Sequence, residues 1–148
     1  MDALVRDLLD YAKPWRVERV PIDLAAAVAG LTTPVETDIP QGLVLTADPA
    51  RLAQALVNLV DNAAASATRV RVAAERAGGD VLVYVCDDGP GVPSEIEASL
   101  FEPFSTRGQA GTGLGLAIVR KVMSAHGGEV SLTRRPGWST CFTLRFPT

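Results

Sequence analysis

The sequence predicts an α+β domain in which a mixed sheet of about five strands packs on about three helices in two layers. Amphipathic helical stretches stand among short alternating strands, and the strand pairs are joined by glycine-containing turns. Length is the third observation, because 148 residues, of which 47% are hydrophobic and 21% charged, can bury one substantial core.

Residues 1–13 place apolar side chains at the spacing of an amphipathic helix, which Pro14 ends. So short a helix is marginal in water, so it either packs on its own domain or is the end of something longer that docks on a partner. Residues 21–31 predict a short helix that is opened by Pro21 or capped by Asp23.

Short strands are predicted at 35–40 and 43–47, around a Gln-Gly turn. A long helix follows, with Asp48 as its N-cap, Pro49 at its first position and its end near Ala67.

Two alternating strands, 69–76 and 80–87, are joined through a Gly-Gly pair. A short helix is predicted at 94–101 and a loop at 105–113. A second long helix follows at 114–128 and ends at another Gly-Gly pair, and a hairpin at 128–146 closes the chain.

Charge and composition exclude several classes of protein. A net charge of −3 argues against bulk electrostatic binding to nucleic acid or anionic membrane. No stretch resembles an 18-residue apolar span and the start is acidic, so we expect a cytoplasmic segment, although a membrane anchor could lie upstream. Cys86 and Cys141 stand far apart in apolar strands, and we expect reduced core thiols.

The long helix has a polar stripe of neutral amides, with Gln54, Asn58 and Asn62 one turn apart. Such a stripe can be an ordinary solvated helix face, although solvated faces usually carry charged residues. An amide oxygen is also a hard neutral ligand that suits Mg²⁺.

The stretch "CDDGPGVP" places Asp87 at the end of an apolar strand, followed by Gly89 and Gly91. Its simplest interpretation is a tight turn. Alternatively, it is the floor of a base pocket, because a carboxylate accepts a hydrogen bond from an amino group such as that of adenine, and glycines allow a flat ring to approach the backbone.

Gly111, Gly113 and Gly115 lead directly into the second long helix. This is either a flexible helix-entry loop or a phosphate site, because amide groups at a helix N-terminus attract anions. It is not a P-loop, and its spacing differs from the dinucleotide fingerprint.

The stretches "ADPARLAQALVNLVDNA", "VCDDGPGVP", "LFEPFSTR" and "GTGLGLAIV" resemble the N, G1, F and G2 boxes of the sensor histidine kinase catalytic domain, and "HGGEV" and "STCFTLRFP" fit its C-terminal pattern. The resemblance covers roughly residues 22–147. It implies the Bergerat ATP-binding fold, ATP and Mg²⁺ as cofactors, and a short lid of the nitrogen-regulation type at Ser105–Ala110.

The resemblance also implies roles for single residues. Asn62 would coordinate Mg²⁺, Asp87 would take the adenine amino group, and Gly89 and Gly91 would form the floor of the base pocket. The lid anchors would be Phe101 and Phe104. The remaining nucleotide-binding residues would be Asn58, Thr106, Arg107, Gly111, Thr112, Gly113, Leu114, Gly115, Leu116 and Thr140.

Asn58 and Arg107 are the expected catalytic residues, with Arg107 in contact with the phosphate tail. In related ATPases the residue one turn before the Mg²⁺ asparagine is a glutamate that activates water. Asn58 cannot take a proton at neutral pH, so the site is suited to transferring phosphate to a protein side chain and not to hydrolysis.

The resemblance implies a phosphoacceptor histidine on a dimeric helical hairpin, but the only histidine is His126, which we interpret as structural. "LVRDLLDYAKP" resembles the end of the second hairpin helix. We therefore expect residues 1–20 to be a hairpin remnant with linker and 21–148 to be the catalytic domain.

The expected function is ATP-dependent protein-histidine kinase activity, with a histidine-bearing dimerisation domain and a response regulator as partners, and without nucleic acid or membrane contact by this segment. The alternatives are an ATP-driven conformational module, a serine-directed anti-sigma-type kinase and a nucleotide sensor or pseudokinase. The amide at position 58 argues against the first, and the hairpin-like start argues against the second.

Overall fold

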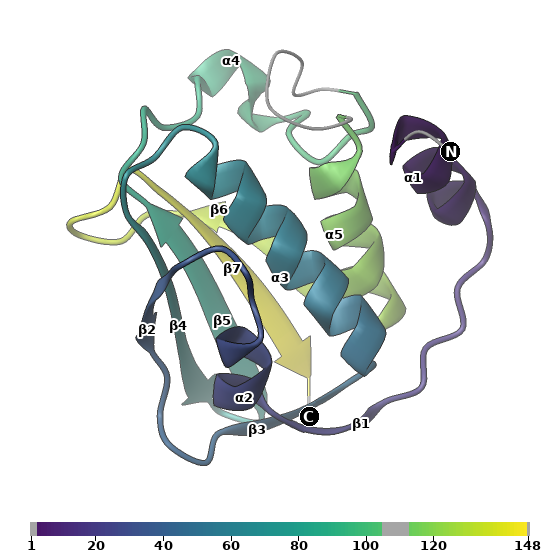
Figure 1. The fold of residues 1–148 in the computed structure, drawn as a ribbon, viewed down its shortest axis with the longest axis vertical. Coiled ribbons are helices and arrows are strands. Elements are labelled where there is room, and N and C mark those ends of the chain that lie inside the picture. The colour runs from purple at the N-terminus through teal and green to yellow at the C-terminus, as the bar shows by residue number, and fades with distance from the viewer. Residues whose placement is uncertain (1–2, 105–112, 148) are drawn as a thin grey trace.

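The computed structural model describes residues 3–104 and 113–147. Its main layer is a five-stranded sheet in the order β2-β4-β5-β7-β6, and helices α3 and α5 cover one face of that sheet (Figure 1). This two-layer arrangement confirms the predicted fold class.

The sheet is mixed, as expected. Strands β4 (Val70–Ala77), β5 (Asp80–Asp87), β7 (Thr140–Pro147) and β6 (Glu129–Thr133) pair antiparallel in that order, and β2 (Glu36–Asp38) adds to β4 in parallel. Both predicted hairpins, β4–β5 and β6–β7, are present. The register places Asp87 directly opposite Thr140.

A second, two-stranded sheet was not predicted. In it β1 (Val20–Asp23) pairs antiparallel with β3 (Val44–Ala47). One expectation is therefore wrong, because residues 21–23 form a strand and not the start of a helix. The predicted strands at 36–38 and 44–47 are present and lie in different sheets. Helix α2 (Leu24–Ala29) begins only after Asp23, whose carboxylate caps it by accepting from the amides of Ala25 and Ala26.

Helix α3 (Pro49–Ala64) starts as predicted, because the Asp48 carboxylate accepts from the first free amides and Pro49 needs no partner there. It ends slightly earlier than expected. Together with α5 (Gly115–Ala125) it buries an apolar face against the sheet, where each fully buried large side chain contributes about 1.5–3 kcal/mol. These core residues are Leu52, Ala55, Leu56, Leu59, Val60, Ala63, Leu116, Ile118, Val119, Val122 and Met123.

Two shorter helices complete the described chain. Helix α4 (Ser94–Glu97) is shorter than the predicted 94–101. Helix α1 (Ala3–Ala12) lies outside the two layers, beside α5 (Figure 1). Among the residues that the structure describes, no helix has both the length and the apolar character needed to cross a membrane.

The expectation of two reduced thiols is wrong, because Cys86 and Cys141 form a disulfide. They are buried as expected, but on the sheet face opposite the main core, with Ala73 and Tyr84 and against Trp138. Their distance in sequence hides the register, which places them directly opposite one another on β5 and β7.

Candidate functional site

Asp87 is a buried carboxylate at the end of β5, with 7% of its surface exposed. Its Oδ1 accepts a hydrogen bond from the amide of Gly89 at 2.9 Å, and its main-chain carbonyl accepts from the amide of Ser139 at 3.0 Å. Oδ2 accepts no hydrogen bond from any residue that the structure describes. The group therefore has a free acceptor atom, and Thr140 is buried beside it on β7.

The environment of Asp87 acts on its pKa. Burial raises the pKa and the neighbouring Asp88 raises it further, while the Gly89 amide lowers it. A buried carboxylate with one unused oxygen is costly unless something binds it.

Asp88 has a structural role, although it stands next to Asp87. Its carboxylate accepts hydrogen bonds from the amides of Thr68 and Arg69 and from the Thr68 hydroxyl. These bonds, the Arg69 amide first, lower the pKa of Asp88. Of the two acidic residues in "CDDG", only Asp87 keeps an oxygen for a ligand.

Gly89 permits a close approach that a side chain would prevent. A Cβ at this position would lie 3.0 Å from Asp87 Oδ1 and 3.2 Å from the Ser66 carbonyl. Gly91 has φ +86°, in the left-handed region that favours glycine. The "CDDGPGVP" stretch is therefore a tight turn, and the backbone beside Asp87 carries no side chain at Gly89 or Gly91.

The amide stripe of α3 divides into two parts. Asn58 donates from Nδ2 to the carbonyl of Gly115 at 3.2 Å, so it joins α3 to the start of α5. Asn62 is half-buried and makes no side-chain hydrogen bond within the described part of the chain. Gln54 instead bonds to Asp10, away from the site.

The glycine-rich stretch leads directly into α5. Gly113 has φ +83°, and among the described residues no side chain caps the N-terminus of α5. Leu114 and Leu116 are buried in the core, so their side chains do not face a ligand. Thr106, Arg107, Gly111 and Thr112, with the predicted lid at 105–110, lie outside the described residues.

The two expected lid anchors differ. Phe101 is partly buried, and its ring meets that of Phe142 edge-on at 5.8 Å. Phe104 is 48% exposed, and it is held by its backbone, since its amide donates to the Gly113 carbonyl at 2.7 Å. That bond joins the two residues on either side of 105–112.

His126 has the structural role that we expected. The ring is buried, Nδ1 donates to the Val122 carbonyl at 2.7 Å, and Nε2 accepts from the Asp48 amide at 2.9 Å. Both nitrogens of the neutral imidazole are occupied, so the ring holds α5 to the start of α3.

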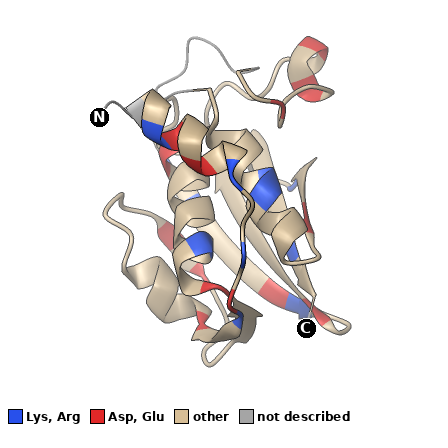
Figure 2. Cartoon of the chain, turned by 90° about the vertical axis from the view of Figure 1, so that its right-hand side faces the viewer, with Lys and Arg blue, Asp and Glu red and all other residues tan. Residues whose placement is uncertain are grey.

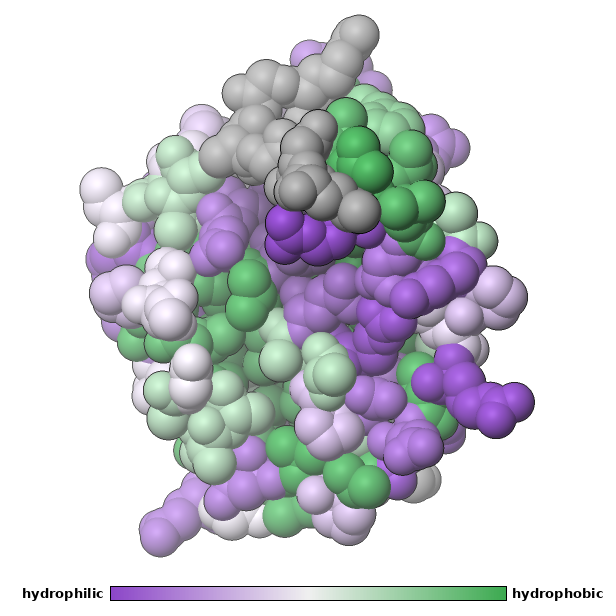
Figure 3. Space-filling model, turned by 45° about the vertical axis from the view of Figure 1, so that its right-hand side comes forward, coloured by the Kyte–Doolittle hydropathy of each residue, from purple (hydrophilic) through white to green (hydrophobic). Residues whose placement is uncertain are grey.

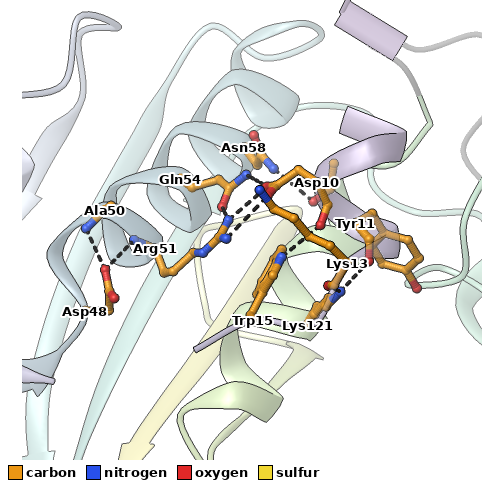
Figure 4. Close-up of polar contacts among 11 residues, drawn as sticks. Asp10, Tyr11, Lys13, Trp15, Asp48, Ala50, Arg51, Gln54, Asn58 and Lys121 are labelled. Carbon is orange, nitrogen blue, oxygen red and sulfur yellow. Dashed lines mark hydrogen bonds and ion pairs between the residues drawn. The ribbon is translucent and has the colours of Figure 1, made fainter. Parts of the chain in front are cut away.

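Sequence reasoning missed one cluster of polar and aromatic residues beside α3 and α5. Asp10 and Trp15, from the N-terminal segment, lie against Arg51 and Lys121, from α3 and α5 (Figure 4). In the sequence this cluster is indicated only by an acidic residue, Asp10, before Pro14 and an aromatic residue, Trp15, after it.

Comparison with known proteins shows the family of the chain. Residues 47–148, more than half of the chain, match the family described as histidine kinase-, DNA gyrase B- and HSP90-like ATPase. Sensor protein DivL of Caulobacter vibrioides is 40% identical over 99% of this chain, which covers 18% of DivL.

Two solved structures are similar as well. Full-length ShkA in complex with AMPPNP has a TM-score of 0.80 and 32% identity, over 97% of this chain and 35% of ShkA. Histidine kinase ThkA in complex with response regulator TrrA has a TM-score of 0.75 and 26% identity, over 97% of this chain and 46% of that one. The chain spans less than half the length of each of these relatives.

The chain belongs to the histidine kinase-, DNA gyrase B- and HSP90-like ATPase family. Within that family it is an ATP-binding catalytic domain of the sensor histidine kinase type, as the four boxes predicted.

Proposed function

We propose that this chain binds Mg-ATP and transfers the γ-phosphoryl group to a histidine on a helical hairpin that the chain does not contain. The observation that carries the proposal is Asp87, a buried carboxylate with one oxygen that accepts no hydrogen bond from the described residues. The Gly89 amide and the buried Thr140 lie next to it. An adenine amino group would supply the missing hydrogen bond.

The residues present suit the metal and the phosphates. Asn62 offers a hard, neutral amide oxygen with no other partner in residues 3–104 and 113–147. The uncapped amides at the start of α5 favour an anion, and Arg107 would add charge there by resemblance. Bound Mg²⁺ would neutralise charge on the phosphates.

Asn58 favours transfer over hydrolysis. Its amide donates to the Gly115 carbonyl and cannot act as a general base for water. The residue organises the site and leaves the nucleophile to be supplied by the acceptor protein.

The acceptor is not His126, since both of its nitrogens are occupied inside the core. Helix α1 exposes four large apolar residues, Leu4, Val5, Leu8 and Leu9. Figure 3 shows a hydrophobic patch in the region of this helix. We infer that residues 1–20 are the end of the histidine-bearing hairpin with its linker, and that 21–148 form the catalytic domain.

A response regulator would take the phosphoryl group from that histidine. The ThkA–TrrA complex supports this inference, because it pairs a histidine kinase similar to this chain with a response regulator. The same relatives favour a kinase over a nucleotide sensor.

Phosphoryl transfer tests the proposal directly. Incubated with γ-labelled ATP, this chain alone should stay unlabelled and produce ADP slowly. Addition of a dimeric hairpin from the full-length kinase should give acid-labile label on the histidine of that hairpin. Label on His126, or rapid hydrolysis without transfer, would contradict the proposal.

Asp87→Asn tests the adenine contact. Loss of a charge-assisted hydrogen bond of about 1.5–3 kcal/mol should weaken ATP and ADP binding by about ten- to a hundredfold. Calorimetric titration of both nucleotides measures it. Wild-type affinity in the folded variant would rule out this role for Asp87.

The same variant should be more stable than the wild type without nucleotide. Since burial raises the pKa of Asp87, the stability linked to this group is fully present below its ordinary pKa and is lost as pH rises through the folded-state value. Asn does not ionise, so the midpoint of thermal unfolding at neutral pH should rise.

A further inference from the structure

Residues 10–19 lie across α3 and α5, and we call this segment the strap. Figure 2, which looks onto that side of the molecule, shows it running over the two helices. The Asp10 carboxylate accepts from both terminal nitrogens of Arg51, at 2.9 and 3.3 Å, and from the Gln54 amide at 3.2 Å. The Asp10 and Arg51 side chains are only 23% and 20% exposed, so the pair is shielded from solvent.

Trp15 contacts both helices at once. Its ring lies 3.7 Å from the Arg51 guanidinium carbon on α3 and 4.5 Å from Lys121 Nζ on α5. The indole N–H donates to the Asp10 carbonyl at 2.9 Å, which closes the strap on itself. Figure 4 shows these side chains converging from three separate elements.

The strap is attached at further points along its length. Lys121 Nζ donates to the carbonyls of Tyr11 and Lys13, where it satisfies free groups at the end of α1. Beyond Trp15, the Glu18 amide donates to the Asp48 carboxylate at 2.9 Å, and Arg19 donates to the Ala125 carbonyl at 3.4 Å. On α3 the attachments lie at the N-cap and in the first two turns, and on α5 they run from the middle of the helix to its end.

The strap and the candidate ATP site use the same two helices. Arg51, Gln54 and Asn58 stand on successive turns of α3, and Asn58 bonds to Gly115, the first residue of α5. The strap joins α3 to α5 through Arg51, Trp15 and Lys121, and the Asn58 side chain joins the same two helices at the candidate site. Both connections therefore constrain the distance between α3 and α5, so a change at one of them affects the other.

We propose that the strap couples the position of α1 to nucleotide binding: docking of residues 10–19 favours the helix spacing that holds ATP, and bound ATP favours the docked strap. This inference rests on the proposed function of the site. Helix α1 contacts α3 and α5 through Asp10 and Tyr11 at its end, so its order responds to docking of the strap.

Arg51→Ala in the complete chain is the central test. It removes both the Asp10 pair and the contact with Trp15. Amide exchange of residues 3–12 should become faster, and affinity for Mg²⁺ with a non-hydrolysable ATP analogue should fall by about fivefold, at the lower end of typical coupling. In the wild type, the analogue should slow exchange in residues 3–12.

Arg71→Ala is the matched control. Arg71 also lies over a tryptophan, Trp138 at 5.3 Å, and also pairs with a carboxylate, Glu36, but on the sheet face away from α3 and α5. It should leave both exchange of residues 3–12 and nucleotide affinity unchanged. Asp10→Asn, a change on the strap itself, should give a smaller effect in the same direction as Arg51→Ala without altering α3.

Two outcomes would overturn the coupling, and they are distinguishable. If Arg51→Ala releases residues 3–12 but binds the analogue like the wild type, and the analogue leaves exchange unchanged, the strap is only an attachment. If the wild type binds no nucleotide, the proposed function fails together with the coupling.

Discussion

The two halves of the polar stripe on α3 are built for different partners. In the half nearer the start of the helix, Arg51 and Gln54 are both bonded to Asp10 within the same chain. In the other half, Asn58 makes one bond, to Gly115, and Asn62 makes none with the residues described. In the first half the polar side chains have hydrogen-bond partners within the folded chain. In the second half the Asn62 amide oxygen has no partner among the described residues.

The chemistry of each half follows from that difference. A charged arginine suits a carboxylate partner that is always present. The neutral amide of Asn62 could coordinate a metal through its oxygen, and without a metal it would not repel phosphate. Equally spaced polar residues on one helix therefore include an intramolecular contact and a candidate ligand site.

Asn62→Ala should produce the largest effect on this comparison. Affinity for Mg-ATP should fall by about tenfold or more, since the amide oxygen would hold the metal. Metal-free nucleotide should bind nearly as in the wild type. Parallel calorimetric titrations with Mg²⁺ and with EDTA measure the difference, and equal losses would show that Asn62 has a structural role.

Asn58→Ala should have an intermediate effect on both halves. It removes the donor to the Gly115 carbonyl, which should lower the free energy of unfolding by about 0.5–1.5 kcal/mol and weaken nucleotide binding several-fold. Urea unfolding and titration together test it. A stability loss with unchanged affinity would separate Asn58 from the ATP site.

Acid should release the strap only after it has protonated Asp87, because the pKa of Asp87 is raised and the pKa of Asp10 is lowered. The Arg51 hydrogen bonds come first among the causes that lower the pKa of Asp10, and Gln54 and the nearby Lys13 lower it further, against an opposing effect of burial. The stability from Asp10 is thus fully present above its ordinary pKa and is lost as pH falls through the lowered value, below about pH 4.

Trp15 emission in a Trp138→Phe background, where it is the only tryptophan, reports this release. Asp10→Asn should abolish the acid transition. Persistence of the transition in that variant would assign it to another group.

Gln54→Ala should have the smallest effect. Asp10 keeps both bonds to Arg51, so the strap should weaken by about 0.5–1 kcal/mol, measured as faster amide exchange in residues 3–12. An effect as large as that of Arg51→Ala would mean that the amide, and not the ion pair, holds the strap.

Much of the fold was predictable from local pattern. Asp48 and Pro49 predict the start of α3 by themselves, because capping involves only neighbouring amides. The alternation of β4 and β5 and their Gly-Gly turn likewise predict a hairpin that the structure contains. The strand at 20–23 was missed, since its partner β3 stands more than twenty residues away, and Pro21 suggested a helix start.

The candidate site was predictable where one stretch contains its own chemistry. Asp87 with Gly89 and the glycine entry to α5 are each readable within a few residues, and the family match confirms the class of protein. The structural role of Asp88 could not be predicted from its own stretch of sequence, because its partners Thr68 and Arg69 come from the connection between α3 and β4.

The sequence by itself determined the class of protein, the start of α3 and both hairpins of the main sheet, because turns, caps and periodicity depend on neighbours along the chain. Only the tertiary structure decided what each polar group meets across the fold. In the folded chain Cys86 forms a disulfide with Cys141, the His126 ring accepts a hydrogen bond from the Asp48 amide, and the Gln54 amide donates to the Asp10 carboxylate. These contacts depend on strand register and helix docking, which are set by burial of the whole apolar core and not by any local segment.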